Sequence, residues 1–308
     1  MIRVDIVVPI RNEEQTLPMF LDRLASLRLP KTLAVKVIFV EDSSVDSTRP
    51  LLRRLAAERP DVGYYCLARG FGQALAASYG ISQSTADAII MMDADGSHPP
   101  EVIPDMVRGF LDGAQVVQCA RRTLSNRKVY RELGAAAFHL LARVLTVTDT
   151  TEQNIFYRLV SADVARDLLR NPRYLTYLRF PLPRADGALR TIYVDSVERV
   201  AGQSNYNLRR LIQLAVEGIL SQMSPTRLGA LVSGMCLAAL SLLVAGHGWA
   251  ATLLATGSVW VIVRYWRLGQ PVLDRMEVLE CRNVPAARGS SNLPPTSSPQ
   301  AEQPPQQS

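Results

Sequence analysis

Two aspartates that follow a short apolar run are the residues of this sequence best suited to chemistry. Asp93 and Asp95 come directly after Ile89-Ile90-Met91-Met92 and are followed by a turn rich in glycine and proline. A short apolar segment bounded by turn residues is typical of a strand buried on both faces. Two carboxylates at this spacing can converge on one hard cation, which takes oxygen ligands and keeps contacts to substrate phosphates. The stretch therefore indicates a candidate metal and phosphate site.

The same stretch allows a second interpretation, in which the polar side chains cap a helix. Asp95 or Ser97 could cap a helix that begins near Pro99-Pro100-Glu101, because Asp and Ser are favoured N-caps and Pro is favoured in the first turn. His98 is open to the same two interpretations, a diphosphate contact or a packed turn residue. The stretch alone does not decide between them.

The elements that must position these residues alternate between strand and helix. Apolar runs at residues 4–10, 35–40, 64–67 and 89–92 each precede a polar turn, and apolar residues recur at helical spacing in between. This alternation predicts an α/β fold with a mostly parallel sheet and helices on both faces. In such sheets ligands bind outside the carboxyl ends of the strands. The polar clusters at 11–14, 41–44, 69–72 and 93–98 are predicted to meet there.

Charge and motif content narrow the partners. The 308 residues carry a formal net charge of +6, and arginines gather at 121–131, 209–210 and 264–267. A basic balance allows nucleic acid, anionic lipid or phosphorylated substrates. Nucleic acid is disfavoured because the arginines do not share a face with aromatic residues. The sequence also lacks a phosphate-loop motif and the third glycine of a dinucleotide fingerprint.

The composition changes near the C-terminus. Leu228 to Gly246 holds 19 residues without a charge, and Trp249 to Val263 is uncharged again. About 20 apolar residues span a bilayer core, so two transmembrane helices are predicted within 227–268. Arginines outside both ends predict that these ends face the cytoplasm. The alternative is a helical hairpin buried in a soluble core. An amphipathic interfacial helix is predicted at 207–226, and a cytosolic tail at 269–308, disordered after about 283.

Four motifs resemble glycosyltransferase family 2. They are Val8-Pro9-Ile10-Arg11-Asn12-Glu13-Glu14, Val40-Glu41-Asp42-Ser43-Ser44, Arg69-x-Phe71-Gly72 and Asp93-Ala94-Asp95-Gly96-x-His98-Pro99-Pro100-Glu101. The closest resemblance is to the polyprenyl-phosphate glycosyltransferases, which include dolichyl-phosphate mannose synthase and undecaprenyl-phosphate sugar transferases. The likeness covers about residues 4 to 267. It implies a GT-A-like, Rossmann-like catalytic domain over residues 1–206, on the cytoplasmic side of the membrane.

The resemblance also implies roles for individual residues. Those expected to bind the nucleotide-sugar are Pro9, Arg11, Glu13, Glu41, Asp42, Arg69, Asp93, Ala94 and Asp95. Asp93, Asp95 and Ser97 are expected to hold Mg²⁺ or Mn²⁺, with Ser97 standing where the family often carries a glutamine. Arg121 and Arg131 are expected to bind the acceptor phosphate and, with the two aspartates, to form the catalytic set.

The function that the resemblance implies is an inverting transfer of a sugar from a UDP- or GDP-sugar to polyprenyl (undecaprenyl or dolichyl) phosphate in the inner or plasma membrane. A homo-oligomer such as a tetramer stays open. Gly70 stands where the family often carries asparagine, and with Ser97 it leaves a second hypothesis open, a nucleotide-sugar-binding membrane scaffold with impaired catalysis. A polysaccharide synthase is disfavoured, because it would need a Q-x-x-R-W motif and more membrane helices.

Overall fold

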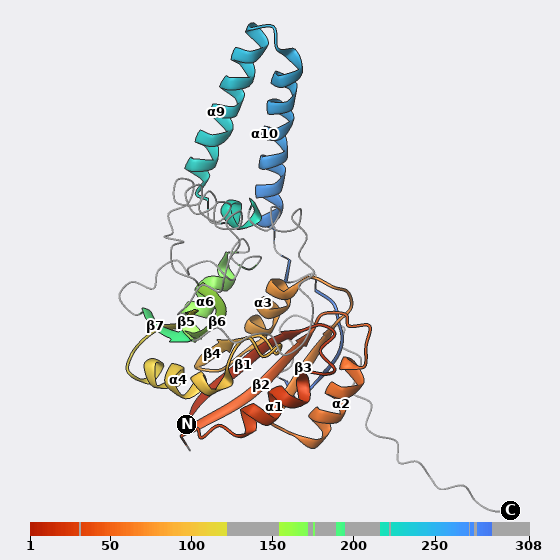
Figure 1. The fold of residues 1–308 in the computed structure, drawn as a ribbon, viewed down its shortest axis with the longest axis vertical. Helices are drawn as coiled ribbons and strands as arrows, with labels where there is room; N and C mark the ends of the chain where they lie inside the picture. The colour runs from red at the N-terminus through yellow and green to blue at the C-terminus, as the bar shows by residue number, and fades with distance from the viewer. Residues whose placement is uncertain are drawn as a thin grey trace, which may run out of the picture.

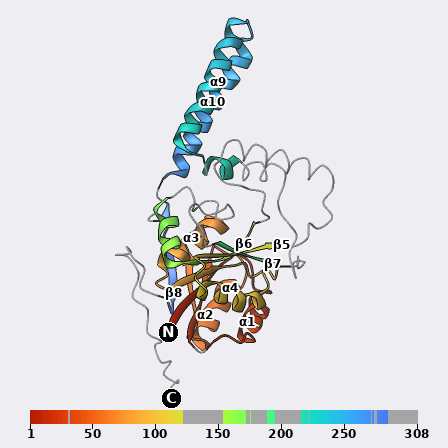
Figure 2. The ribbon, with the colours of Figure 1, turned by 90° about the vertical axis from the view of Figure 1, so that its left-hand side faces the viewer.

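The computed structural model describes residues 1–30, 32–121, 154–171, 175, 189–194, 216–221, 223–270, 272–273 and 276–284. Within these residues the chain forms a sheet between two layers of helices, and a pair of long helices projects from one side (Figures 1 and 2). The elements are β1 (Ile2–Ile10), α1 (Leu17–Ala25), β2 (Leu33–Glu41), α2 (Thr48–Glu58), β3 (Val62–Leu67), α3 (Gln73–Gln83), β4 (Ala88–Met91), a 3₁₀ helix (Pro100–Val102), α4 (Ile103–Leu111), β5 (Val116–Arg121), β6 (Asn154–Ser161), α6 (Ala162–Arg170), β7 (Leu189–Val194), α9 (Pro225–Val244), α10 (Gly248–Leu268) and β8 (Val278–Arg282).

The sheet has the strand order β7-β5-β6-β4-β1-β2-β3-β8. β1 lies between β2 and β4 and runs parallel to both, and β2 runs parallel to β3. The carboxyl ends of these four strands therefore lie along one edge of the sheet. This arrangement confirms the α/β fold and the alternation of strand and helix that the N-terminal sequence predicts.

The prediction of a mostly parallel sheet holds for β1 to β5 and β7, and the sheet is mixed because two strands, β6 and β8, run the other way. β6 runs antiparallel to β4 and to β5, and β8 runs antiparallel to β3. β6 lies between β4 and β5, outside the βα alternation of the N-terminal strands from which parallel neighbours are predicted. One consequence bears on the site. Because β6 is antiparallel both to β4 and to β5, β5 runs the same way as β4, and both strands end at the same edge of the sheet.

Two apolar cores form because successive strand residues point to opposite faces. One core packs against α1, α2 and α4 and includes Val8, Phe39 and Ile90. The other packs against α3 and α6 and includes Ile38 and Val40. A slip of β2 by one residue would exchange these two sets of side chains between the faces. Each buried Val, Leu, Ile or Phe contributes about 1.5–3 kcal/mol, so the register of the strands is strongly fixed.

The helices α9 and α10 form a helical hairpin where the sequence predicts two transmembrane helices, and the crossing of a membrane stays a prediction. α9 and α10 lie side by side and project from the side of the domain that carries α3 and α6 (Figures 1 and 2). Apolar side chains along them are open to the surroundings: Leu240 is 58% exposed and Trp260 is 54% exposed. The alternative of a hairpin buried in a soluble core is therefore wrong. Of the described helices one, α9, is long and apolar enough by length and composition to cross a membrane.

The base of the hairpin is tied to a short helical segment at residues 216–221. Arg264 of α10 forms an ion pair with Glu217, and the Tyr265 hydroxyl donates a hydrogen bond to the Met223 carbonyl oxygen at 3.2 Å. Ile219 and Leu220 complete an apolar cluster with the two long helices. The predicted interfacial helix at 207–226 is thus helical over 216–221, and residues 207–215 lie outside the described part of the chain.

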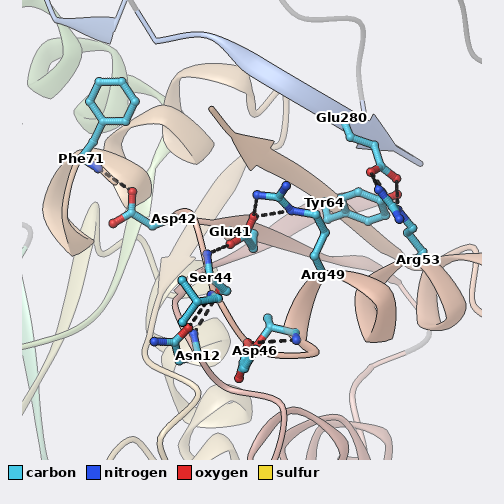
Figure 3. Close-up of polar contacts among 12 residues, drawn as sticks. Asn12, Glu41, Asp42, Ser44, Asp46, Arg49, Arg53, Tyr64, Phe71 and Glu280 are labelled. Carbon is cyan, nitrogen blue, oxygen red and sulfur yellow. Dashed lines mark hydrogen bonds and ion pairs between the residues drawn. The ribbon is translucent and has the colours of Figure 1, made fainter. Parts of the chain in front are cut away.

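Strand β8 was not expected from the sequence, which predicted only a cytosolic tail there. It follows the hairpin and pairs with β3, placing Tyr65 opposite Cys281. Glu280 of β8 accepts hydrogen bonds from the Arg53 guanidinium and from the Tyr64 hydroxyl (Figure 3). The side-chain amide of Asn283 donates to the carbonyl oxygens of Ala56 and Val62. The chain thus returns from the hairpin and pairs with the edge of the sheet.

Replacing Glu280 by alanine should destabilise the protein by about 1–3 kcal/mol. The substitution leaves the Tyr64 hydroxyl, on a side chain that is 1% exposed, without its acceptor. A loss of this size corresponds to several degrees in the thermal unfolding midpoint of the detergent-purified protein. Glu277→Ala is the matched control, because this neighbouring side chain is exposed and contributes only its carbonyl oxygen, to the Ala68 N–H. Equal midpoints for the two variants would contradict the role of Glu280.

Candidate active site

The loops that follow β1 and β2 hold each other in place. The backbone N–H groups of Asn12 and Glu13 donate to the Ser44 hydroxyl at 3.0 Å and the Thr48 hydroxyl at 2.9 Å. In return the Val45 N–H donates to the Asn12 side-chain oxygen at 2.9 Å (Figure 3). Three further residues extend this lattice: Glu14, Asp46 and Ser47. Many polar groups of these two loops therefore bind the neighbouring loop instead of pointing outward as potential ligands.

Glu41 and Asp42 are adjacent in sequence but serve opposite faces of the sheet. Glu41 points toward α2, is fully buried, and accepts hydrogen bonds from the Arg49 guanidinium at 2.7 and 3.0 Å and from the Ser44 N–H. Both of its oxygens are engaged, so the structure places Glu41 in the scaffold of the loop. This differs from the nucleotide contact that the sequence predicted, and the alternation of strand residues is the physical reason.

Asp42 points the other way, to the start of α3. Its carboxylate accepts the backbone N–H of Phe71 at 2.6 Å and that of Gly72 at 2.9 Å (Figure 3). Gly72 has φ 93° and ψ 156°, a conformation open to glycine and strained for other residues. Asp42 therefore anchors the turn that leads from β3 into α3. The anchor sits beside Arg69, whose guanidinium lies 5.0 Å from the centre of the Phe71 ring.

Arg11 and Gly70 meet across the ends of β1 and β3. A Cβ atom at position 70 would lie 3.0 Å from an Arg11 guanidinium nitrogen. The absence of a side chain at Gly70 thus leaves room for the exposed Arg11 cation. Where the family often carries asparagine, this chain has Gly70, and the Arg11 guanidinium lies next to it.

The Asp93-Ala94-Asp95 loop follows β4 and is buried on one side. Asp93 is 9% exposed; its backbone N–H donates to His98 Nδ1 at 2.8 Å, and its Oδ1 accepts a hydrogen bond from the Gln73 side chain. His98 stacks on the Tyr157 ring with centroids 5.1 Å apart, and the Tyr157 hydroxyl donates to the Pro99 carbonyl oxygen. The structure therefore favours the packed-turn interpretation of His98.

The helix-capping interpretation of this loop is wrong. The 3₁₀ helix at Pro100–Val102 and helix α4 both begin without a side-chain cap. Asp95 Oδ1 instead accepts the Ser97 N–H at 3.0 Å within a turn in which Gly96 has φ 80°. Ser97 is 7% exposed, and the Ala94 methyl group packs in the core beneath the loop. Of the two aspartates in this loop, Asp93 is buried and Asp95 is partly exposed.

Glu13 adds a third carboxylate to the loop. Burial raises the pKa of Glu13; the Thr16 hydroxyl opposes this by hydrogen bonding, and the charges of Asp95 and Asp93 raise the pKa further. The three acids are thus close enough to repel one another. Among the described residues no group of three His, Cys, Asp or Glu side chains is arranged as a complete metal cage.

The structure places the remaining predicted residues as follows. Pro9 is buried in β1 opposite Val40. The backbone of Arg121 ends β5 opposite Val194, at the edge that carries the acid loop. β6 separates β5 from β4, and two strand spacings amount to about 10 Å. Arg131 lies outside the described residues. Gln73 was missed: it is the first residue after a glycine turn at the start of a helix, and that position is the available signal.

The mixed sheet with acidic loops at the ends of its parallel strands defines a GT-A-like glycosyltransferase fold. It is shared with glucosyl-3-phosphoglycerate synthase from Mycobacterium tuberculosis, solved with Mn²⁺, UDP-glucose and phosphoglyceric acid (TM-score 0.50, 18% identity, 71% of this chain and 78% of that one). Mannosyl-3-phosphoglycerate synthase from Rubrobacter xylanophilus is similar to the same degree (TM-score 0.50, 17% identity, 71% and 72%). At these identities the likeness concerns the fold alone.

The chain belongs to glycosyltransferase family 2, because the family's sequence model, described as Glycosyl transferase family 2, matches residues 5–161. The prophage bactoprenol glucosyl transferase homolog of Escherichia coli K12 is 30% identical over 219 residues, which cover 71% of this chain and 72% of the relative. The undecaprenyl-phosphate 4-deoxy-4-formamido-L-arabinose transferase of Yersinia pestis is 32% identical over 218 residues (69% and 65%). The resemblance drawn from the motifs is confirmed.

Replacing Glu13 by glutamine should stabilise the chelator-treated protein near neutral pH. The folded-state pKa of Glu13 is raised, so folding favours the protonated acid, and the wild type loses stability as pH rises through that pKa. The difference in thermal midpoint between Glu13→Gln and wild type should therefore be largest at pH 8 and shrink as pH falls toward 4.5.

Glu101→Gln provides a control of opposite sign. A hydrogen bond from Arg23 lowers the pKa of Glu101, so this carboxylate stabilises the fold above its ordinary pKa and stops doing so as pH falls. Glu101→Gln should lower the midpoint slightly at pH 8. A Glu13→Gln midpoint below that of wild type at pH 8 would contradict the raised pKa of Glu13, which burial and the two aspartates cause together.

Proposed function

We propose that the protein transfers a sugar from a nucleotide-sugar to a polyprenyl phosphate at a membrane surface. Two features of this family 2 chain carry the proposal. Acidic loops lie at one edge of the sheet, and an exposed apolar hairpin is followed by β8, which pairs with the same sheet. The relatives named as bactoprenol and undecaprenyl-phosphate transferases support this choice of acceptor.

The donor is a UDP- or GDP-sugar in this proposal, held along the edge from β3 to β4. Asp42 and the Arg69 loop lie at the nucleoside end, and the loop of Asp93 and Asp95 lies at the diphosphate end. Arg11 is the exposed cation between them. Guanidinium groups bind phosphate oxygens strongly and can do so through two parallel hydrogen bonds.

The acid loop fits a divalent cation such as Mg²⁺ or Mn²⁺. Its donors are hard carboxylate oxygens, and positive charge would relieve the repulsion from Asp95 and Asp93 that, after burial, raises the pKa of Glu13. Asp95 is the first ligand in this assignment, with Asp93 and Ser97 beside it. Mg²⁺ typically uses one or two carboxylates together with substrate phosphates, which agrees with an incomplete cage in the protein alone. When bound, the cation neutralises charge on the departing diphosphate.

The reaction is a displacement at the anomeric carbon. A phosphate oxygen of the lipid attacks that carbon, the bond to the nucleoside diphosphate breaks, and the configuration inverts. The second pKa of a phosphate monoester is about 6, so the attacking group is already ionised near neutral pH. A strong general base is not required, and the packed His98 is left with its structural role. Holding two reactants in line can lower the barrier by about 7–11 kcal/mol.

The acceptor side is assigned to basic residues and the hairpin. Arg121 ends β5 at the catalytic edge, and with Arg131 it would bind the lipid phosphate. α9 and α10 would both cross the inner or plasma membrane, the second with Arg264 and Arg267 at the interface. The catalytic domain and both termini would face the cytoplasm, and assembly into a homo-oligomer such as a tetramer is part of the same proposal.

Turnover tests the proposal, with Asp95→Ala as its negative control. Membranes that contain the wild-type protein, given labelled UDP- or GDP-sugars, undecaprenyl phosphate and Mn²⁺, should yield a labelled product that extracts into organic solvent. Asp95→Ala should reduce the rate at least about 100-fold, because the carboxylate that would hold the cation beside the departing diphosphate is lost. Binding of nucleoside diphosphate without any transfer would instead support the scaffold hypothesis, and full activity of Asp95→Ala would refute the metal assignment.

Replacing Arg121 by alanine should raise the KM for the lipid phosphate more than the KM for the sugar donor. A charge-assisted hydrogen bond contributes about 1.5–3 kcal/mol, so an increase of about 10-fold or more is expected for the lipid. Arg108→Ala is a suitable control, since this exposed arginine lies on α4 and pairs with Asp105 on the same helix. An equal rise in both KM values would show that Arg121 has a structural role.

A further inference from the structure

The start of helix α3 contacts acids that belong to two different strands. The N–H groups of Phe71 and Gly72 grip Asp42 at the end of β2, and the side-chain amide of the next residue, Gln73, donates a hydrogen bond to Asp93 after β4. In the sheet β2 and β4 lie on either side of β1. Three consecutive residues thus bridge about 10 Å, the width of two strand spacings.

Asp93 is held from both sides. Gln73 donates to its Oδ1, while its Oδ2 lies 3.9 Å from His98 Nε2. His98 Nδ1 accepts the Asp93 N–H at 2.8 Å, so in the neutral ring the proton resides on Nε2, the nitrogen that faces the carboxylate. The His98 ring is fixed by stacking on Tyr157. Gln73 therefore supplies the contact that comes from outside the loop of Asp93 itself.

The chemistry of the amide suits this place. An amide N–H orients a carboxylate without cancelling its charge, whereas a lysine or arginine would neutralise it. The contact therefore adds no positive charge beside Asp93, whose carboxylate would face a cation or a ribose hydroxyl group. Gly72, with its positive φ of 93°, turns the chain so that the helix begins at Gln73 beside the acid loop.

We propose that Gln73 is a positioning residue that sets the spacing between the nucleoside end and the diphosphate end of the donor site. This inference rests on the proposed function. Gln73 acts through Asp93: it links the acid loop to the same turn that Asp42 anchors, so both ends of a nucleotide-sugar meet one rigid unit. Its effect belongs to the donor and not to the acceptor lipid.

Gln73→Met tests the inference, because methionine has a similar length and no amide donor. The variant should raise the donor KM, and the dissociation constant of UDP or GDP with Mn²⁺, by about 10-fold, the lower range for one charge-assisted hydrogen bond. The KM for lipid phosphate should stay within about twofold of the wild type. Gln83→Met is the matched control: it makes the same substitution at the last residue of α3, where the side chain donates to Ser82 at 3.2 Å. This control should match the wild type in donor KM.

The split between the two KM values is the readout that a merely structural role would not move. A general loosening of the fold would raise the KM for the lipid phosphate together with the donor KM. Loss of the hydrogen bond from Gln73 to Asp93 should raise the donor KM alone, also in a preparation whose thermal midpoint equals that of the wild type.

The outcomes separate the inference from the function on which it rests. If the wild type transfers sugar while Gln73→Met retains its donor KM, or raises both KM values alike, the positioning role is overturned and the proposed function stands. If Gln83→Met raises the donor KM as much as Gln73→Met, the effect belongs to the helix in general and the role is likewise overturned. A wild type that neither binds nucleoside diphosphate nor transfers sugar overturns both.

Discussion

The site depends on two hydrogen bonds that the Asp42 carboxylate accepts from the backbone N–H groups of Phe71 and Gly72. Asp42 holds the turn at Phe71 and Gly72, and this turn begins α3, the helix that packs on β1 and β2. Hydrogen bonds to a charged acceptor are stronger than neutral ones, and this acceptor is 3% exposed. The loop after β3 therefore has one position relative to β2. Gln73, the residue after this turn, carries the same position on to Asp93.

Much of this arrangement could be predicted from the sequence, and the reason is periodicity. Short apolar runs followed by polar turns define the four N-terminal strands, and parallel strands bring those turns to one edge. The hairpin follows from its lack of charge. The direction of Glu41 could also have been derived, because strand residues alternate between faces and its neighbour Asp42 faces α3. The chemical likeness of two adjacent acids concealed their different surroundings.

The rest depends on contacts between distant parts of the chain, which no local pattern reports. β6 enters between β4 and β5 and makes the sheet mixed. Gln73 reaches Asp93 only because the fold brings the start of α3 to the end of β4. Ser44 and Thr48, which follow β2, look like possible ligands in the sequence. Their hydroxyl groups instead accept hydrogen bonds from the loop after β1. Long-range pairing decided each of these cases.

Strand β8 has a consequence for the order in which the protein is made. β3 has β2 on one side, and its other side is an open strand edge until residues 278–282 arrive. Those residues are synthesised after both helices of the hairpin, and chains fold from the N-terminus during synthesis. Gly63, where a Cβ would lie 2.5 Å from the Asn283 carbonyl oxygen, keeps the docking place clear. The pairing of β8 with β3 therefore forms only after the hairpin has left the ribosome, so the sheet is completed late in the synthesis of the protein.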